Sequence, residues 1–255
     1  MRLMRRRLAP PGLTALALAL ASAFAAPASC AADRDALRRI VEEQCLVHWR
    51  EQRSPAPCEE IDVEDGAHPQ AGYAILADRK GGAHFLLIPT STITGIESPA
   101  LLAPDALNYF DDAWQARERL ARVVGHEVPR DKIGLAVNPL HARSQDQLHI
   151  HIECLRPDVL AALSRAKLTE SWSPIDLGGT SYAARTIAGE NLKRANPFRL
   201  LAADMPQPGK TVGDYTLVVA GTGSTSEPGF IVLASTTAAG ELLLDSTCAA
   251  ASDGR

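Results

Sequence analysis

The sequence predicts an α+β protein in which helices pack on an antiparallel sheet. Two pairs of strand-like runs carry this prediction: residues 73–76 with 84–88, and residues 132–137 with 148–154. An amphipathic helix is expected between the pairs, so the predicted order along the chain is hairpin, helix, hairpin. This order is typical of a helix that covers one face of an antiparallel sheet.

The helices are predicted from the spacing of apolar residues and from residue types that begin or end helices. Apolar residues recur at a helical spacing from Leu37 to Cys45, and Asp33 can cap this first helix at its N-terminus. The central helix is expected to open at residues 104–105, to bury an apolar stripe, and to stop at Gly125.

A short helix is expected from residue 157, followed by a further pair of strand-like runs at residues 215–220 and 230–234. The sequence of this pair loosely resembles that of the hairpin at residues 73–88. The pair is therefore expected to form a C-terminal hairpin extension, which is either a degenerate half-repeat of the fold or an unrelated hairpin.

Residues 1–32 are expected to lie outside the folded domain, which spans residues 33–255. Four arginines precede an uncharged, largely apolar stretch that contains small-residue cleavage sites. The segment is therefore either a signal peptide or an uncleaved N-terminal membrane anchor. In both cases the domain is exported to the far side of a membrane.

The composition limits the class of function. The chain has 255 residues, 46% hydrophobic and 22% charged, as expected of a globular protein. Its formal charge is −4, and it becomes −8 without residues 1–32, which hold four basic and no acidic residues. An acidic domain lacks the basic surface that general nucleic-acid binding needs, so no nucleic-acid partner is expected.

The cysteines agree with export. Apart from Cys30 in the leader, the chain has Cys45, Cys58, Cys154 and Cys248. An even number of cysteines in an oxidising compartment suggests two disulfides. Three pairings are open, and we favour Cys45–Cys58, which closes a short Pro-containing loop, with Cys154–Cys248, which ties the tail to the core.

The most informative stretch is residues 144–157, SQDQLHIHIECLRP. On a strand, His149 and His151 point to one face, while Leu148, Ile150 and Ile152 point to the other. Exposed histidines on an edge strand often have no function. Two histidines beside a polar loop, residues 138–147, instead favour a functional site.

A metal is one explanation of the two histidines. It would need further ligands, for which His84, His141 and Glu153 are available. The spacing matches neither the cupin pattern nor the metallo-lactamase pattern, so no metal and no cofactor are expected. The second explanation is covalent catalysis on a phosphoanhydride, in which a neutral imidazole attacks phosphorus and polar groups hold its oxygens.

Several motifs resemble those of the histidine-triad (HIT) hydrolases and nucleotidyltransferases. That superfamily has a strand like HFLLIP at residues 84–89, then a helix, an Asn-bearing loop and a strand like QLHIHIE at residues 147–153. ESP at residues 97–99, WQAR at residues 114–117, HIHIECLRPDV and the cysteine positions are similar to those of the bacterial CDP-diacylglycerol pyrophosphatase family within it. The resemblance implies a HIT-like fold over residues 33–255.

The resemblance also implies a role for each polar residue. His149 matches the middle histidine of the triad, the nucleophile, and His151 matches the third, supporting histidine. Gln147 stands where the first histidine would be; Gln can form hydrogen bonds but cannot carry a proton charge. Asn138, Ser144 and Gln145 match polar residues that bind the substrate phosphates.

Three basic residues lie near the histidine strand in the sequence: Arg143, Lys132 and Arg156. They are either further contacts to the anionic substrate or ordinary solvated charges.

The implied reaction is hydrolysis of CDP-diacylglycerol to CMP and phosphatidate through a cytidylyl-histidine intermediate. The implied partners are this substrate and a membrane lipid surface, at the periplasmic face of the bacterial inner membrane or in the periplasm. Two alternatives remain: a hydrolase or transferase of soluble nucleotide anhydrides, and a catalytically silent nucleotide- or lipid-binding protein.

Overall fold

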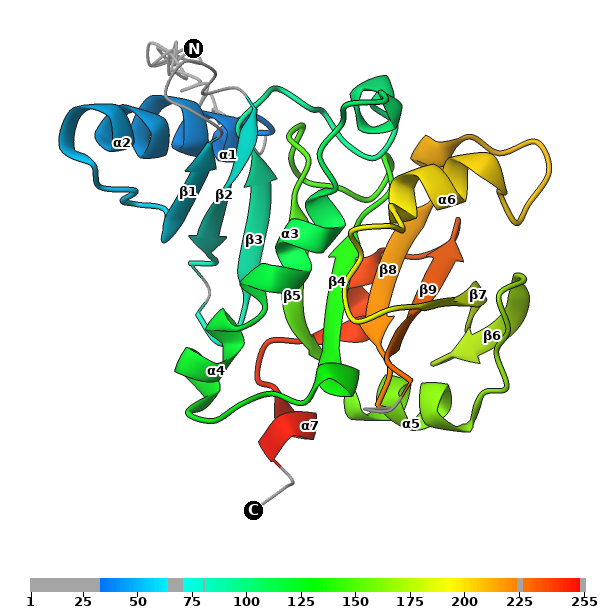
Figure 1. Ribbon diagram of the computed structural model, residues 1–255. Coiled ribbons are helices and arrows are strands. Elements are labelled where there is room, and N and C mark those ends of the chain that lie inside the picture. Colours follow the sequence, from blue (N-terminus) through cyan, green and yellow to red (C-terminus); the bar gives the residue numbers. More distant parts are fainter. Residues whose placement is uncertain (1–32, 64–70, 80, 224–226, 253–255) are drawn as a thin grey trace, which may run out of the picture. The chain divides into compact units, whose positions relative to one another are not determined.

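Ten antiparallel strands form one sheet in the computed structural model, which describes residues 33–63, 71–79, 81–223 and 227–252 (Figure 1). Residues 1–32, to which the leader prediction refers, lie outside the described residues. The strands along the sheet are ordered β1-β2-β3-β5-β4-β8-β9-β7-β6, and β10 pairs with β5. Their bounds are β1 Glu60–Val63, β2 Gly72–Ala77, β3 Phe85–Pro89, β4 Ile133–Val137, β5 Ile150–Leu155, β6 Ser173–Leu177, β7 Thr180–Ala188, β8 Thr216–Gly221, β9 Gly229–Ser235 and β10 Leu244–Asp245. The prediction of an α+β fold with an antiparallel sheet is confirmed.

The helices are short. They are α1 Ala36–Arg39, α2 Leu46–Gln52, α3 Tyr109–Ala116, α4 Arg119–Val124, α5 Pro157–Arg165, α6 Pro197–Ala203 and α7 Ala249–Ser252. A π-helical segment, Ile40–Cys45, joins α1 to α2. Asp33 does not cap this first helix: the helix begins three residues later, and the Asp33 carboxylate accepts a hydrogen bond from the amide of Asp35.

The central helix starts later than predicted and is divided into α3 and α4, which end at Gly125 with φ of 86°. Its predicted opening is instead a turn, in which the amide of Ala106 donates to the carbonyl of Ala103. Arg199 of α6 also donates to the carbonyls of Ala103 and Pro104. Tertiary contacts from the second half of the chain therefore override the local helix-start signal.

The sheet consists of two halves with the same topology. In the first half, β2 and β3 are followed by α3 and α4, then by β4 and β5; in the second, β6 and β7 are followed by α6, then by β8 and β9. Both halves have the spatial order first, second, fourth, third strand, and they meet where β4 pairs with β8, with Gly134 opposite Ala220.

The C-terminal hairpin is therefore part of the sheet and not an extension added to it. Its strands, β8 and β9, occupy the place that β4 and β5 occupy in the first half. The sequence similarity had instead related β8 and β9 to β2 and β3. It therefore matched the wrong pair of strands between the two halves. The similarity lies in the apolar runs that largely buried strands such as β3, β8 and β9 require.

Helices cover both faces of the sheet. Side chains of α3, α4 and α6 form one apolar cluster with one face, and in Figure 1 α3 and α6 lie in front of the strands. The other face carries two apolar clusters, one under the segment α1–α2 and one under α5 and residues 240–244. These two clusters leave the middle of that face to polar residues.

Two disulfides hold the ends of the described chain. Cys45–Cys58 ties the π-helical segment to the approach to β1, with Cα atoms 5.6 Å apart, and Cys154–Cys248 ties β5 to the C-terminal tail, with Cα atoms 5.1 Å apart. This is the pairing favoured from the sequence, and two disulfides indicate an oxidising compartment. Within the described ranges, none of the helices has the length and apolar content needed to cross a bilayer.

Candidate active site

A strip of polar side chains runs along β5 on the face between the two apolar clusters. His151 lies on β5 directly opposite Leu86 on one side and Ala136 on the other. Residues opposite each other in an antiparallel ladder share a face, and Leu86 and Ala136 belong to the clusters under α1–α2 and α5 respectively. We call His84, His149, His151 and Glu153 the polar strip.

The histidines are not on an edge strand. β5 lies between β3 and β4, and His149 and His151 are 7% and 5% exposed. Burying two imidazoles in a sheet is unfavourable unless their nitrogens form hydrogen bonds or meet charges. In the second half of the sheet, β9 presents the apolar side chains of Ile231 and Leu233 to the corresponding face.

The imidazole of His149 is held by its own chain. Its Nδ1 lies 2.8 Å from the carbonyl oxygen of Gln147. A carbonyl can only accept, so Nδ1 must carry the proton and Nε2 must carry the lone pair. In the described part of the chain, Nε2 takes part in no hydrogen bond. The imidazole therefore has the tautomer of a nucleophile.

Burial lowers the pKa of the His149 imidazole below its usual value, because the charged form loses its hydration. The hydrogen bond to Gln147 and the negative charge of Glu241 oppose this shift, and the positive charge of Arg143 adds to it. Glu241 was not singled out from the sequence. It lies in the tail, and although the predicted Cys154–Cys248 disulfide brings the tail to β5, no sequence pattern indicates that Glu241 faces the histidines.

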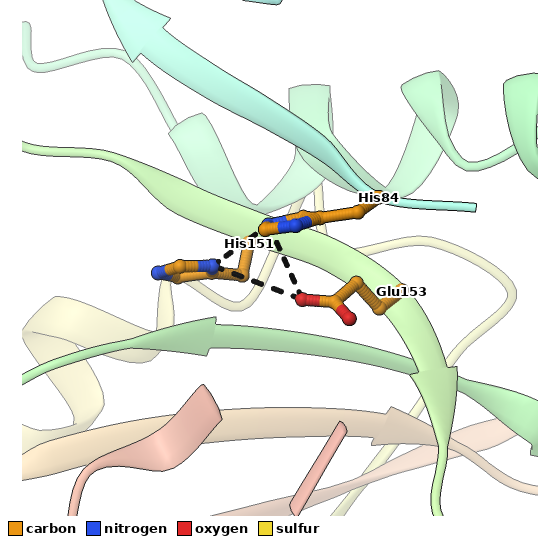
Figure 2. Close-up of side chains that lie close together, drawn as sticks. All are labelled: His84, His151 and Glu153. Atoms are coloured by element: carbon orange, nitrogen blue, oxygen red, sulfur yellow. Dashed lines mark hydrogen bonds and ion pairs between the residues drawn. The ribbon is translucent and has the colours of Figure 1, made fainter. Parts of the chain in front are cut away.

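His151 joins His149 to the rest of the strip. The two ring centroids are 5.1 Å apart, in an edge-on arrangement. Figure 2 shows that His151 and Glu153 of β5 converge with His84, which directly precedes β3. The Nδ1 of His151 lies 3.0 Å from the Nε2 of His84, and the Nε2 of His151 lies 3.4 Å from a carboxylate oxygen of Glu241.

Gln147 fixes the chain ahead of β5. Its side-chain amide is buried, and its nitrogen donates to the carbonyls of Pro89 and Ser91, at 3.0 Å and 2.9 Å. Both carbonyls lie at the end of β3, so Gln147 ties β3 to the segment that carries His149. Its side-chain oxygen has no hydrogen-bond partner in the described part of the chain.

The loop of residues 138–147 is held by an ion-pair network. Arg143 is buried, and its guanidinium donates to Glu97 at 2.5 Å and to Asp146 at 3.0 Å. Asp146 also pairs with Arg34, which lowers the pKa of its carboxyl to about 2. Burial raises the pKa of the Glu97 carboxyl, but hydrogen bonds from Arg143, Thr94 and the backbone, together with the charge of Arg143, outweigh this effect and the pKa is lowered. Arg143 is thus not an ordinary solvated charge.

The predicted phosphate-binding residues differ in their surroundings. Asn138 is buried, and its side-chain oxygen lies 3.4 Å from the amide of Glu241, which leaves its NH₂ group as a donor. Ser144 is exposed. Gln145 accepts from the amide of Leu37 and donates to the carbonyl of Asp33, so its side chain holds the start of α1 against the loop.

The sequence model of the family described as CDP-diacylglycerol pyrophosphatase matches residues 32–252. A protein of Yersinia pestis, described as CDP-diacylglycerol pyrophosphatase, is 42% identical over 189 residues, which cover 72% of this chain and 71% of that protein.

Proposed function

The chain belongs to the CDP-diacylglycerol pyrophosphatase family, and from this premise we propose that it hydrolyses CDP-diacylglycerol to CMP and phosphatidate through a cytidylyl-histidine intermediate. The observation that carries the mechanism is the hydrogen bond between the Nδ1 of His149 and the carbonyl of Gln147. That bond fixes the lone pair on Nε2, which is what a nucleophilic imidazole requires.

In the first step, the Nε2 of His149 attacks the phosphorus that bears cytidine. The bond between this phosphorus and the bridging oxygen breaks, and phosphatidate leaves as a phosphate monoester. In the second step, water attacks the same phosphorus, the phosphorus–nitrogen bond breaks, and CMP is released. A phosphate monoester is a good leaving group, so no strong general acid is needed where Gln147 replaces a histidine.

Neighbouring residues hold the nucleophile and the substrate. His151 packs edge-on against His149, and Gln147 fixes the backbone carbonyl that orients it. The NH₂ group of Asn138, which donates no hydrogen bond within the described ranges, and the hydroxyl of Ser144 are the proposed donors to the phosphate oxygens. Gln145 would act through the position of the loop, since both ends of its amide already bind the start of α1.

The site of action follows from the substrate and the disulfides. CDP-diacylglycerol is a membrane lipid, and the two disulfides indicate an oxidising compartment. We therefore propose that the protein works at the periplasmic face of the inner membrane, held there by residues 1–32 or released into the periplasm after cleavage.

The intermediate can be trapped and located. The purified full chain is mixed with CDP-diacylglycerol labelled in the cytidine phosphate, quenched with base within one turnover, and mapped by peptide mass spectrometry. We expect CMP attached to His149, and release of CMP and phosphatidate in the steady state. A label on another residue, or no label during turnover, would contradict the mechanism.

Parallel assays separate the alternatives. Faster turnover of dinucleotides or CDP-alcohols than of the lipid would indicate a hydrolase of soluble anhydrides. Binding of CDP-diacylglycerol with no CMP release would indicate a silent binding protein. His126→Ala serves as the matched control, since His126 lies at the end of α4 and contacts only the carbonyl of Glu127 among its described hydrogen bonds.

A further inference from the structure

We propose that His84, His151 and Glu153 form a binding site for a divalent transition-metal ion, with Zn²⁺ as the best match to the ligand set. Among the described residues, these three form a group of His and acidic side chains whose ligand atoms all lie within 4.8 Å of one another. Two imidazoles and one carboxylate are ligands that Zn²⁺ accepts. The sequence had offered His84 and Glu153 as additional ligands for a His-x-His site.

The spacing of the three ligand atoms fits a metal ion. The Nε2 of His84 lies 3.0 Å from the Nδ1 of His151 and 3.2 Å from a carboxylate oxygen of Glu153, and the latter two atoms are 3.8 Å apart. Tetrahedral Zn²⁺ with bonds of about 2.0–2.1 Å places its ligands about 3.3–3.4 Å apart. The three distances lie on both sides of that value, and one point lies about 2.0 Å from all three atoms.

Both outer nitrogens of the two imidazoles face carboxylates. The Nδ1 of His84 lies 3.7 Å from Asp78, and the Nε2 of His151 lies 3.4 Å from Glu241. Metal-binding histidines commonly direct their other N–H to a carboxylate, which sets the tautomer and leaves the lone pair on the nitrogen that faces the ion. Here this tautomer places one lone pair on the Nε2 of His84 and one on the Nδ1 of His151, the two nitrogens that face each other.

Charge and burial favour a cation at the same place. Glu153 and His151 are buried, and the side chain of His84 is 12% exposed. Three carboxylates, those of Asp78, Glu153 and Glu241, surround the two imidazoles. A buried carboxylate needs compensating positive charge, and a divalent ion supplies it without protonation of both rings. The ion would take the place of the hydrogen bond between His84 and His151.

The proposed site does not include the nucleophile, although its ligand His151 packs edge-on against His149. His149 is not a ligand of the ion, so the Nε2 of His149 stays available. The ion would link the start of β3 to β5. The inference does not depend on the proposed reaction, because metal binding is measured without substrate.

The test uses the full chain purified without a histidine tag, stripped of metal with a chelator and then dialysed. Zn²⁺ is titrated against a chromophoric competitor, bound metal is counted by mass spectrometry, and Co²⁺ is added separately to record its d–d absorption. We expect one ion per chain and the intense bands of a four-coordinate Co²⁺ site. His84→Ala and Glu153→Gln should each weaken binding at least about 10-fold, and His126→Ala should not.

Two further variants keep the ligands and protect the test against misfolding. Asp78→Asn and Glu241→Gln change only the outer carboxylates, and each should weaken Zn²⁺ binding by about 10-fold to 100-fold. Circular dichroism of every variant checks the fold. Binding of less than one Zn²⁺ per chain by the wild-type protein would overturn the proposal. Equal Zn²⁺ affinity of the wild-type protein and all four variants, the two at ligands and the two at outer carboxylates, would also overturn it.

Discussion

Arg143, which is buried, forms an ion pair with the half-buried Glu97, with 2.5 Å between the guanidinium nitrogen and the carboxylate oxygen, and this pair joins the loop ahead of β5 to the segment after β3. The same guanidinium also binds Asp146, so one side chain serves two carboxylates. There is no room for a side chain beside this pair: a Cβ placed on Gly95 would clash with both partners, at 2.7 Å from the Glu97 carboxylate and closer still to the Arg143 guanidinium. The pair therefore sets the path of the loop that ends at His149.

Replacing this guanidinium should weaken both stability and turnover. Arg143→Lys keeps the charge but cannot make the forked contacts to two carboxylates, so we expect a loss of about 2 kcal/mol in the free energy of unfolding. Turnover of CDP-diacylglycerol should fall as the loop loosens. Urea unfolding and a CMP-release assay measure the two effects. Arg122→Lys, which alters an exposed pair with Glu59, should change stability by less than about 0.5 kcal/mol.

The two disulfides should differ in what they contribute. Cys154–Cys248 closes a sequence separation of 94 residues and Cys45–Cys58 one of 13. Loop-closure entropy predicts losses of about 4–5 kcal/mol and about 3 kcal/mol when each pair is replaced by alanine. Chemical unfolding of the two double variants tests the order. A larger loss for the Cys45–Cys58 pair would show that native packing, and not the unfolded chain, determines the difference.

Asp112 should make the protein less stable as the pH rises. Burial, together with the charges of Asp111 and Asp62, raises the pKa of its carboxyl from 3.8 to about 7. The folded state then binds the proton more tightly than the unfolded state, so stability is lost progressively as the pH rises from about 4 to about 7. Asp112→Asn removes the free-energy cost of ionising this carboxyl in the folded protein. It should add about 2 kcal/mol at pH 8 and little near pH 4, as measured by thermal or urea unfolding.

The antiparallel sheet could be predicted from the sequence because short apolar runs bounded by turn residues are a local signal. The runs at β2, β3, β4, β5, β8 and β9 were found within one or two residues. The hairpin of β6 and β7 was missed, since its burial is partial and its composition mixed. The pairing of β4 with β8, which builds the second half of the sheet, is a long-range contact that periodicity does not encode.

The candidate site was likewise predicted only in part, because local spacing is visible in the sequence and long-range contacts are not. His149 and His151 stand on one strand, so their shared face follows from spacing alone. His84 and Asp78 come from the turn between β2 and β3, and Glu241 comes from the tail, so the register of β3 with β5 and the path of the tail bring them to the histidines of β5. The hydrogen bonds that occupy Gln145 likewise depend on how α1 docks, which the loop sequence does not show.

Removing the imidazole of His149 should abolish turnover and leave the fold intact. His149→Gly deletes the nucleophile and its hydrogen bond to Gln147, so we expect CMP release to fall by about 10³-fold or more. The variant also leaves a space the size of an imidazole, and added free imidazole should restore part of the activity if nucleophilic attack is all that was lost. Circular dichroism and urea unfolding check the fold, and His126→Ala is the matched histidine control. Turnover near the wild-type rate in His149→Gly would show that another group attacks the phosphorus, because no other atom at that position could carry the cytidylyl group.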